Sequence, residues 1–355
     1  MTPARVAFVS HNASRSGAPL LLLQLQRWLL DHSDHELVTV LLDGGPLEAD
    51  FAAVGPVVGP DDLAGLDADL VYLNTVGAAP ALAVLPDGPK VVCHVHELDY
   101  ALTHWIDEAD RDRLRHRVDR FLVVSQLVRA ALERCVGVDP GRVEVHYGFV
   151  DVAAVAAGAP APAASGTRVI GASGTHVIGA SGTTEWRKAP DLFLALAAAV
   201  ERRRPGGEYP WVGGADRGPE IDGVLADRDR LGLTDSVRFV GEQPDARAWF
   251  AAFDVFALVS RDDPFPLTVL EAAALGVPVV AFDSTGAREF LADGCGVVVP
   301  YPDVEAMADA VVRLLDDGPG RAALVEAARR RVRADHDLGV AAPRLQAAIE
   351  SVLAS

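Results

Sequence analysis

One stretch, Ser260 to Phe290, constrains the fold of this 355-residue chain most, because it predicts a loop, a short helix, a buried strand and a second loop in direct succession. Pro266 suits the first position of the helix, since its ring pre-sets the backbone angle and its missing N–H would be unpaired there anyway. Gly276 is a helix stop, and Pro278 is a second one. The apolar, β-branched run Val277 to Phe282 predicts a strand buried on both faces of a parallel sheet. The stretch therefore predicts an α/β protein.

The start of this helix has the chemistry of an anion site. The amides near Leu267 and Thr268, together with the helix dipole, attract a negative group. Asp263 and Glu271, eight positions apart, place carboxylates on either side of the turn, and a carboxylate only accepts hydrogen bonds,. A ligand that carries both phosphate and hydroxyl groups, such as a nucleotide sugar, fits this combination. The alternative is an ordinary helix start whose acidic residues complement the dipole.

The same stretch resembles the donor-binding motif of the retaining glycosyltransferases of family 4, whose fold is called GT-B. That motif is E-x7-E, set in S-x-x-E-x-F-G-L-x-x-L-E-A-x-A-x-G-x-P-V-V-A. The chain departs from it at two positions: Asp263, one methylene shorter, replaces the first Glu, and Pro266 replaces the usual Gly. The matching residues are Ser260, Phe265, Leu267, Leu270, Glu271, Ala272, Gly276, Pro278, Val279, Val280 and Ala281.

The resemblance implies a GT-B fold, an α/β architecture of two Rossmann-like, doubly wound domains that face each other across a cleft. Residues 1–160 would form an N-terminal Rossmann-like acceptor domain, and residues 161–335 a C-terminal Rossmann-like domain that binds the nucleotide-sugar donor. Residues 336–355 would form a helix that crosses back to the N-terminal domain. Apolar runs predict strands at 6–10, 37–42, 70–73, 91–94, 121–124, 142–145, 211–214, 237–240, 253–259 and 297–300,. Helices are expected at about 304–315, 321–334 and 340–353.

The chain opens with a strand, a loop and an apolar helix at about 20–30, as a Rossmann-like unit does,. The loop is not a G-x-G-x-x-G sequence, so the dinucleotide fingerprint is absent,. In the resembled family a glycine-rich loop lies here near the donor diphosphate, and Gly17 matches it. A plain turn between strand and helix is the alternative.

His94, His96 and Glu97 come at the carboxyl end of the strand predicted at 91–94, where doubly wound sheets bind their ligands,. Alternation puts the two histidines on one face of the segment. The three residues could bind a metal, but their spacing lacks the i, i+4 geometry of H-E-x-x-H. In the resembled family a histidine just after this strand lies beside the reacting sugar, and His96 matches it best. The alternative is a strand-end histidine with an ordinary hydrogen bond.

A basic segment at 111–120 contains five arginines. Leu114, Val118 and Phe121 fall at helical spacing, so we expect one amphipathic helix. Some members of the resembled family use a basic patch in this domain to contact membranes. Two interleaved aspartates and a net charge of −18 favour a solvated face instead, so we expect membrane contact to be peripheral at most,.

The segment 151–165 is rich in Ala, Pro and Gly and almost uncharged, which is typical of a linker,. A repeat follows it: V-I-G-A-S-G-T at 169–175 recurs letter for letter at 177–183. The second copy runs directly into T-E-W-R-K, so we assign it the first strand and turn of the second domain. The first copy is expected to be an added loop or an edge strand from a local duplication.

Arg187 and Lys188 are expected to open the next helix, where tandem cations oppose the helix dipole and therefore indicate a ligand. They suit a diphosphate, Arg through its planar fork and Lys as a point charge. Lys188 is one of only two lysines among 32 basic residues, which favours a need for a compact ammonium there. The resembled family has G-R-x-x-x-x-K-G-x-D in this region. Lys188 matches its Lys, the early Arg is missing, and Arg187 would take its place.

Composition excludes several classes of protein. A net charge of −18 argues against nucleic acid binding, which calls for a basic surface,. No apolar run reaches the about 18 residues of a membrane span, and we expect no signal peptide at the N-terminus. The three scattered cysteines form no metal spacing and cannot all pair, which favours the reducing cytoplasm,.

The resemblance implies an enzyme, a retaining glycosyltransferase that moves a sugar from a UDP-, GDP-, ADP- or dTDP-sugar to the hydroxyl of a natural product, glycan or lipid. The nucleotide sugar is a co-substrate, and no cofactor or metal ion is expected to be required. The resemblance places donor phosphate at Arg187 and Lys188, sugar hydroxyls at Asp263 and ribose at Glu271. His96, Lys188 and Asp263 are the expected catalytic residues. The expected substrate-binding residues are Gly17, Arg187, Lys188, Asp263, Phe265, Pro266, Leu267, Thr268 and Glu271. A GT-B-like sugar-nucleotide epimerase and a non-catalytic sugar-nucleotide-binding relative are the alternatives.

Overall fold

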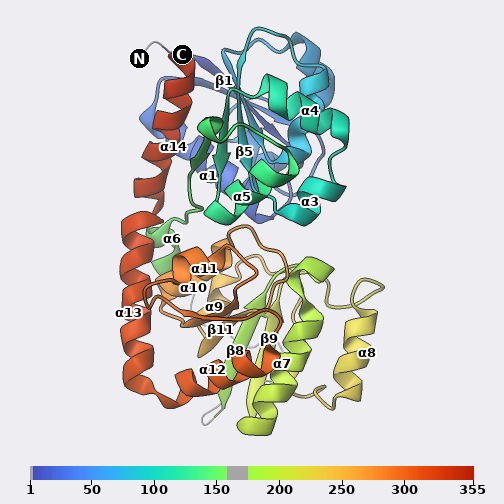
Figure 1. The fold of residues 1–355 in the computed structure, drawn as a ribbon, viewed down its shortest axis with the longest axis vertical. Coiled ribbons are helices and arrows are strands. Elements are labelled where there is room, and N and C mark those ends of the chain that lie inside the picture. Colours follow the sequence, from blue (N-terminus) through green and yellow to red (C-terminus); the bar gives the residue numbers. More distant parts are fainter. Residues whose placement is uncertain (1–2, 158–174) are drawn as a thin grey trace. The chain divides into compact units, whose positions relative to one another are not determined.

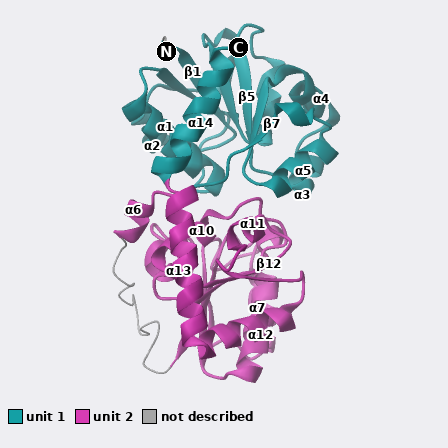
Figure 2. Ribbon diagram, turned by 60° about the vertical axis from the view of Figure 1, so that its left-hand side comes forward, with its two compact units in different colours: residues 1–149, 338–355 teal, residues 150–337 magenta. Residues whose placement is uncertain are grey.

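The computed structural model describes residues 3–157 and 175–355, which form two compact units (Figure 2). Unit 1 comprises Met1–Phe149 and Leu338–Ser355, and unit 2 comprises Val150–Asp337. Each unit has its own parallel sheet. Two Rossmann-like units of α/β architecture are therefore confirmed, as the sequence predicts.

Unit 1 contains a seven-stranded sheet in the order β3-β2-β1-β4-β5-β6-β7. The order changes direction between β1 and β4, and such a switch point is where doubly wound sheets bind ligands, beyond the carboxyl ends of the strands. The strands are β1 (Arg5–Ser10), β2 (Glu36–Leu41), β3 (Val57–Val58), β4 (Leu70–Asn74), β5 (Lys90–Val95), β6 (Arg120–Val123) and β7 (Val143–Val145).

Helices cover both faces of this sheet, as Figure 1 shows, with α1 and α14 on one side and α3, α4 and α5 on the other. The final helix α14 packs against α1 and β5, and Trp28 Nε1 donates to Gln346 Oε1 at 3.3 Å. The helices are α1 (Gly17–His32), α2 (Glu48–Ala52), α3 (Asp99–His104), α4 (Glu108–Arg117), α5 (Gln126–Cys135) and α14 (Leu338–Leu353). Three 3-10 segments lie at η1 (Pro60–Gly65), η2 (Val76–Ala83) and η3 (Pro140–Arg142).

Unit 2 contains a six-stranded sheet in the order β10-β9-β8-β11-β12-β13, with its switch point between β8 and β11,. The strands are β8 (His176–Ser181), β9 (Gly207–Val212), β10 (Val237–Phe239), β11 (Val255–Leu258), β12 (Val279–Phe282) and β13 (Val297–Val299). The helices are α6 (Val152–Ala156), α7 (Pro190–Arg203), α8 (Asp222–Arg230), α9 (Arg247–Phe250), α10 (Leu267–Leu275), α11 (Ala287–Leu291), α12 (Val304–Asp316) and α13 (Gly318–Asp335), with a 3-10 turn η4 (Trp186–Lys188).

The core of unit 2 forms because the apolar faces of α7 and α12 pack together over the β-branched strands. Trp211 is buried at its centre, with Phe193 at 5.5 Å and Phe239 at 6.0 Å between ring centroids. Burying one such aromatic side chain stabilises the fold by about 1.5–3 kcal/mol. The strands that precede the loops of the site are therefore held by a closely packed core.

Three details of the predicted elements are wrong. Pro266 is the residue before helix α10, with ψ 113°, and the helix begins at Leu267. Arg187 and Lys188 do not open an α-helix; they lie in η4, and α7 begins at Pro190 because Ala189 adopts a left-handed conformation (φ 60°) between the two. The segment at 111–120 is not one helix either: α4 ends at Arg117, and Phe121 belongs to β6.

The predicted linker at 151–165 differs in its first part, where the Asp151 side chain accepts a hydrogen bond from the Ala154 amide and caps α6. A short helix forms because this capping bond satisfies an amide that would otherwise be unpaired. The second copy of the repeat forms β8 and its turn, as predicted. Residues 158–165 of the predicted linker and residues 169–174 of the first copy lie outside the described residues.

Candidate functional site

The carboxyl edge of the unit 2 sheet brings together two predicted site residues that are 75 positions apart. Lys188, which follows β8, has its Nζ 2.6 Å from Oδ2 of Asp263, which follows β11. The Lys188 side chain is 20% exposed and that of Asp263 is 6% exposed. A charge-assisted bond of this length between partly desolvated groups is a strong one.

Backbone hydrogen bonds hold the two loops in this register. The carbonyl of Arg187 accepts from the amide of Arg261 at 2.8 Å, and the carbonyl of Asp263 accepts from the amide of Gly286 at 2.9 Å. Gly182 allows the lysine side chain to run close to the loop after β8, since a Cβ there would lie 2.9 Å from Lys188 Cγ. The pair is therefore positioned by the ends of β8, β11 and β12.

Arg187 lies beside the pair, and its guanidinium is held by other groups of the same edge. Its Nη2 donates to Glu185 Oε1 at 3.1 Å, and its Nη1 donates to the carbonyl of Asp262 at 3.5 Å. Thr183 Oγ1 donates to the same Glu185 oxygen at 2.6 Å. Two cations thus lie next to each other at one sheet edge, each with an acidic neighbour.

Helix α10 begins at this edge, directly after Asp263. Its first amides, at Leu267 and Thr268, have no intrahelical acceptor, as in any helix. Pro266 provides no side-chain cap for them. Phe265 is buried and its ring stacks on His336 at 5.4 Å, so this predicted binding residue contributes packing that fixes the helix start. The helix ends at Gly276 in the left-handed conformation (φ 81°), as predicted.

Glu271 lies one turn further along α10 and is partly buried. Burial raises the pKa of its carboxyl to about 7; the Arg247 guanidinium works against this rise and the Asp245 carboxylate adds to it. Arg247 itself is held by Asp245, with Nε to Oδ1 and Nη2 to Oδ2 both 2.8 Å. Near neutral pH, Glu271 therefore takes up and releases a proton easily.

The carboxyl edge of the unit 1 sheet carries the second predicted group. His94 is buried, its Nδ1 is 2.6 Å from the Tyr72 hydroxyl, and its ring centroid is 4.2 Å from that of His96. Burial lowers the pKa of His96 to about 3, with a smaller effect from His11, and burial also lowers the pKa of His94 well below its usual range. Both imidazoles are neutral at physiological pH.

Glu97 differs in role from its two histidine neighbours. Its Oε2 accepts hydrogen bonds from the amides of His96 at 2.8 Å and Val76 at 3.2 Å, so the carboxylate orders the loop after β5 and the start of η2.

The described residues contain no group of three or more His, Cys, Asp or Glu side chains placed to hold a metal ion. Gly17 is the first residue of α1 in unit 1 and is exposed.

Three further polar residues at the unit 1 edge are not among the predicted site residues. Asn74, the last residue of β4, is fully buried, and Thr75 has a positive φ of 84°, which is strained for a β-branched residue,. Thr75 Oγ1 is 3.0 Å from Nδ1 of His11, which follows β1. Asn74, Thr75 and His11 each lie at or just after the end of an apolar strand. This position is the sequence signal from which they could have been predicted.

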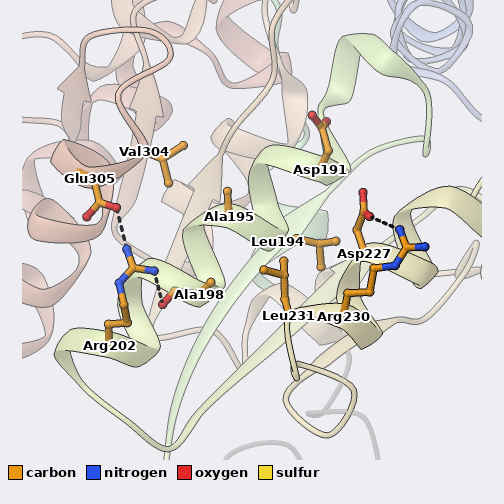
Figure 3. A pocket seen from close by; sticks show the side chains of 10 residues that line it. All are labelled: Asp191, Leu194, Ala195, Ala198, Arg202, Asp227, Arg230, Leu231, Val304 and Glu305. Carbon is orange, nitrogen blue, oxygen red and sulfur yellow. Dashed lines mark hydrogen bonds and ion pairs between the residues drawn. The ribbon is translucent and has the colours of Figure 1, made fainter.

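A separate surface pocket of about 460 Å³ lies between α7, α8 and the start of α12 (Figure 3). Its walls carry the ion pairs Arg202–Glu305 and Arg230–Asp227 over a small apolar floor. It contains neither Lys188 nor Asp263, so it is distinct from the sheet edge.

None of the helices in the described part of the chain has both the length and the apolar composition of a membrane span.

Comparisons with known protein families match two separate parts of the chain. The family described as Glycosyl transferases group 1 matches residues 175–317, and Glycosyltransferase Family 4 matches residues 60–154. The lipopolysaccharide core biosynthesis mannosyltransferase LpsB of Rhizobium meliloti is 36% identical over 146 residues, which cover 39% of this chain and 40% of that protein. A D-inositol 3-phosphate glycosyltransferase of Salinispora arenicola is 38% identical over 157 residues, 40% of this chain and 34% of that protein. The matched part thus spans about two fifths or less of these relatives.

Solved structures share the fold over the whole chain. Anabaena HepE in complex with UDP and glucose has a TM-score of 0.83 at 19% identity and covers 98% of this chain and 100% of its own. Sucrose-phosphate synthase of Thermosynechococcus elongatus has a TM-score of 0.80 at 19% identity, with 99% of both chains covered. With a matched family in each unit and this shared architecture, the chain belongs to the group 1, family 4 glycosyltransferases and has their GT-B fold.

Proposed function

We propose that this protein transfers a sugar from a nucleotide-sugar donor to an acceptor hydroxyl, with retention of the anomeric configuration. One observation carries the proposal: Lys188 and Asp263 form a 2.6 Å ion pair beside Arg187 and the uncapped start of α10. Cations and helix amides suit a diphosphate, and a buried carboxylate suits sugar hydroxyls. The two kinds of group are adjacent, as they are in a nucleotide sugar.

Departure of the nucleoside diphosphate is the step that this arrangement would assist. Negative charge develops on the leaving diphosphate as the bond to the sugar breaks, and fixed donors stabilise that charge most in the transition state. Lys188, Arg187 and the amides of Leu267 and Thr268 are the donors. When the diphosphate takes over the Lys188 ammonium, Asp263 becomes available to accept hydrogen bonds from sugar hydroxyls.

Two other predicted residues complete the proposal. Glu271 would accept hydrogen bonds from the ribose, and the neutral His96 would contact the sugar near its reacting centre. Because Lys188 and Arg187 already supply positive charge to the diphosphate, we propose that no metal ion is required. On cysteine usage alone we also propose the cytoplasm as the compartment.

The relatives indicate which donors and acceptors to test first. LpsB is named a mannosyltransferase, another relative is a GDP-mannose-dependent mannosyltransferase, and HepE was solved with UDP-glucose. Several relatives are named D-inositol 3-phosphate glycosyltransferases. GDP-mannose and UDP-glucose are therefore the first donors, and sugar or inositol hydroxyls are the first acceptors.

Release of nucleoside diphosphate and of sugar products tests the proposal. The protein is incubated with GDP-mannose or UDP-glucose, with and without an acceptor panel, and the products are followed by proton NMR. We expect diphosphate release that rises with one acceptor and a product with the donor's anomeric configuration. An epimerised product without acceptor would indicate an epimerase, binding without turnover a non-catalytic protein, and an inverted product would contradict retention.

A further inference from the structure

The side chain of Arg261, in the loop after β11, reaches across the edge of the unit 2 sheet to the turn that contains Lys188. Its Nη1 donates to the carbonyl of Trp186 at 3.0 Å, and its Nη1 and Nη2 donate to the two carboxylate oxygens of Asp191 at 2.9 and 2.5 Å. These partners lie 75 and 70 positions before Arg261 in the sequence. One side chain therefore fastens the loop after β11 to η4 and to the start of α7.

The groups that Arg261 bonds stand on either side of a strained residue. Ala189, between η4 and α7, has a φ of 60° in the left-handed region, and it is fully buried. A residue with a Cβ is disfavoured in that region about five- to thirtyfold. Such strain persists only where the surrounding structure fixes it. Trp186 precedes Ala189 and Asp191 follows it, so Arg261 holds the turn at both ends.

Arg261 is itself fixed by its surroundings. Its amide donates to the carbonyl of Arg187 at 2.8 Å, and its guanidinium carbon lies 5.5 Å from the centroid of the Trp186 ring. The Arg261 side chain is 14% exposed. Because Asp191 engages the planar fork of the guanidinium, that fork is not available to bind a phosphate in the same bidentate way. Arg261 therefore differs from Arg187 and Lys188, to which the proposed function assigns the phosphate.

We propose that Arg261 is a positioning residue: it holds Ala189 in the left-handed conformation and thereby aims the Lys188 ammonium. Lys188 directly precedes Ala189, so a change in the backbone of Ala189 redirects the lysine. The ammonium points at the Asp263 carboxylate in the ligand-free protein and at the donor phosphate in the complex. This inference rests on the proposed function and adds to it a residue that acts on the ligand through Lys188 alone.

A similar arrangement occurs a second time in unit 2 and provides the matched control. Arg331 donates to the carbonyls of Phe290 and Ala292 at 3.0 and 2.7 Å. It also donates to Oδ2 of Asp293 at 2.8 Å, and Asp293 has a φ of 56°. This turn follows α11 and contains none of the predicted site residues. Arg331→Gln therefore removes an equivalent set of bonds away from the turn of Lys188.

The direction of the Lys188 side chain in the ligand-free protein is the first measurement. Lys188 and Lys90 are the only lysines of the chain, so NMR of protein with an isotope label at lysine Cε gives one signal for each, assigned with Lys188→Ala. We expect Arg261→Gln to shift the Lys188 signal toward that of an unpaired lysine and to leave the Lys90 signal in place. Arg331→Gln should shift neither. An unshifted Lys188 signal in Arg261→Gln would overturn the proposal.

Binding of UDP and GDP is the second measurement, made by calorimetry. Loss of the bonds from Arg261 allows Ala189 to leave the left-handed region, so we expect Arg261→Gln to weaken the diphosphate that the wild type binds by about tenfold. Arg331→Gln should bind that diphosphate as tightly as the wild type does. Unchanged affinity in Arg261→Gln would contradict the positioning role.

Rescue by Ala189→Gly separates positioning from a direct contact between Arg261 and the ligand. Glycine adopts a φ of 60° without a steric penalty,. The double variant Arg261→Gln/Ala189→Gly should therefore recover most of the affinity and the Lys188 signal of the wild type, so that the two changes are coupled rather than additive. A double variant that binds as weakly as Arg261→Gln would overturn the proposal, because the loss would then not pass through Ala189.

Failure of the proposed function can be distinguished from failure of this inference. If the wild type binds neither UDP nor GDP, the proposed function fails, and the lysine signals still test Arg261, because they need no ligand. A Lys188 shift in Arg261→Gln that Ala189→Gly reverses supports positioning, and a shift that it does not reverse overturns it. If Arg261→Gln does not fold, Arg261→Lys is used, since it keeps the charge beside Asp191 but lacks the planar fork. Its Lys188 signal should shift in the same direction, and an unshifted signal overturns the proposal.

Discussion

Lys188 and Asp263 neutralise each other in the ligand-free protein, with 2.6 Å between Nζ and Oδ2. The proposed function gives Lys188 to the phosphate and Asp263 to the sugar hydroxyls of the donor. On this proposal, a ligand that carries both groups separates the pair and gives each member a new partner. A ligand with phosphate alone would leave Asp263, which is almost fully buried, without its cation.

The first prediction concerns the stability of this pair. Lys188→Met leaves the Asp263 carboxylate uncompensated, so we expect the free energy of unfolding to fall by about 1–3 kcal/mol. Adding Asp263→Asn removes the buried charge and should restore most of the loss. Urea unfolding of the two single variants and the double variant gives the coupling energy directly. Strictly additive losses would show that the two side chains do not interact.

The second prediction concerns pH and Glu271. The pKa of this carboxyl is about 7 in the folded protein, above its usual value of about 4.5. Below pH 4.5 the group is protonated in both states. Between pH 4.5 and 7 the unfolded state releases its proton while the folded state keeps it, and above pH 7 the folded state bears the full cost of ionising a partly buried group. The contribution to stability is thus present at low pH and lost above pH 7.

Glu271→Gln should therefore be more stable than the wild type by about 2–3 kcal/mol above pH 8 and should show no such gain near pH 4.5. Urea unfolding at both pH values measures the difference. Asp191→Asn is a control that should instead lose stability at both pH values, because the pKa of this carboxyl, paired with Arg261, is lowered and the group is ionised at each of them. A gain for Glu271→Gln that does not change with pH would contradict the raised pKa.

The third prediction concerns the end of α10. Gly276 has a φ of 81°, and a Cβ there would collide with the guanidinium of Arg329, whose Nη2 donates to the Leu275 carbonyl at 2.9 Å. Gly276→Ala should destabilise the protein by about 2–3 kcal/mol, the sum of backbone strain and a lost hydrogen bond.

Gly206→Ala is the matched control, because Gly206 has a φ of 91° but no atom within 4 Å of the added Cβ. It should cost only the strain of about 1–2 kcal/mol. Thermal unfolding of both variants separates the two contributions. Equal losses at the two positions would mean that the contact with Arg329 does not stabilise the end of α10.

Much of the fold could be predicted because most of the strands are uninterrupted apolar runs. The strand expected at 70–73 is β4, Leu70–Asn74, and the one expected at 91–94 is β5, Lys90–Val95. The two-residue strand Val57–Val58 was missed, since two residues show no period. Phe121 matched the helical spacing by chance and belongs to a strand.

The site was predictable only where a local pattern exists. The helix stop at Gly276 follows from one residue type, but the pairing of Lys188 with Asp263 depends on how two loops meet across the sheet. Asn74 carries no periodic signal, because its environment is set by β1 and β5, which are distant in the sequence. Burial decides the pKa of Glu271, and the sequence alone gives no measure of burial.

The measurement that tests the central claim most directly is thermal stabilisation by UDP-, GDP-, ADP- and dTDP-sugars in the wild type and in Lys188→Ala. Lys90→Ala is the control, since Lys90 is the other lysine of the chain and lies in unit 1, near Asp119. Binding to the folded state raises Tm by mass action. We predict a rise with one nucleotide in the wild type and in Lys90→Ala, and none in Lys188→Ala relative to its own baseline. A full rise in Lys188→Ala would contradict the phosphate assignment, and no rise in any protein would contradict the donor site itself.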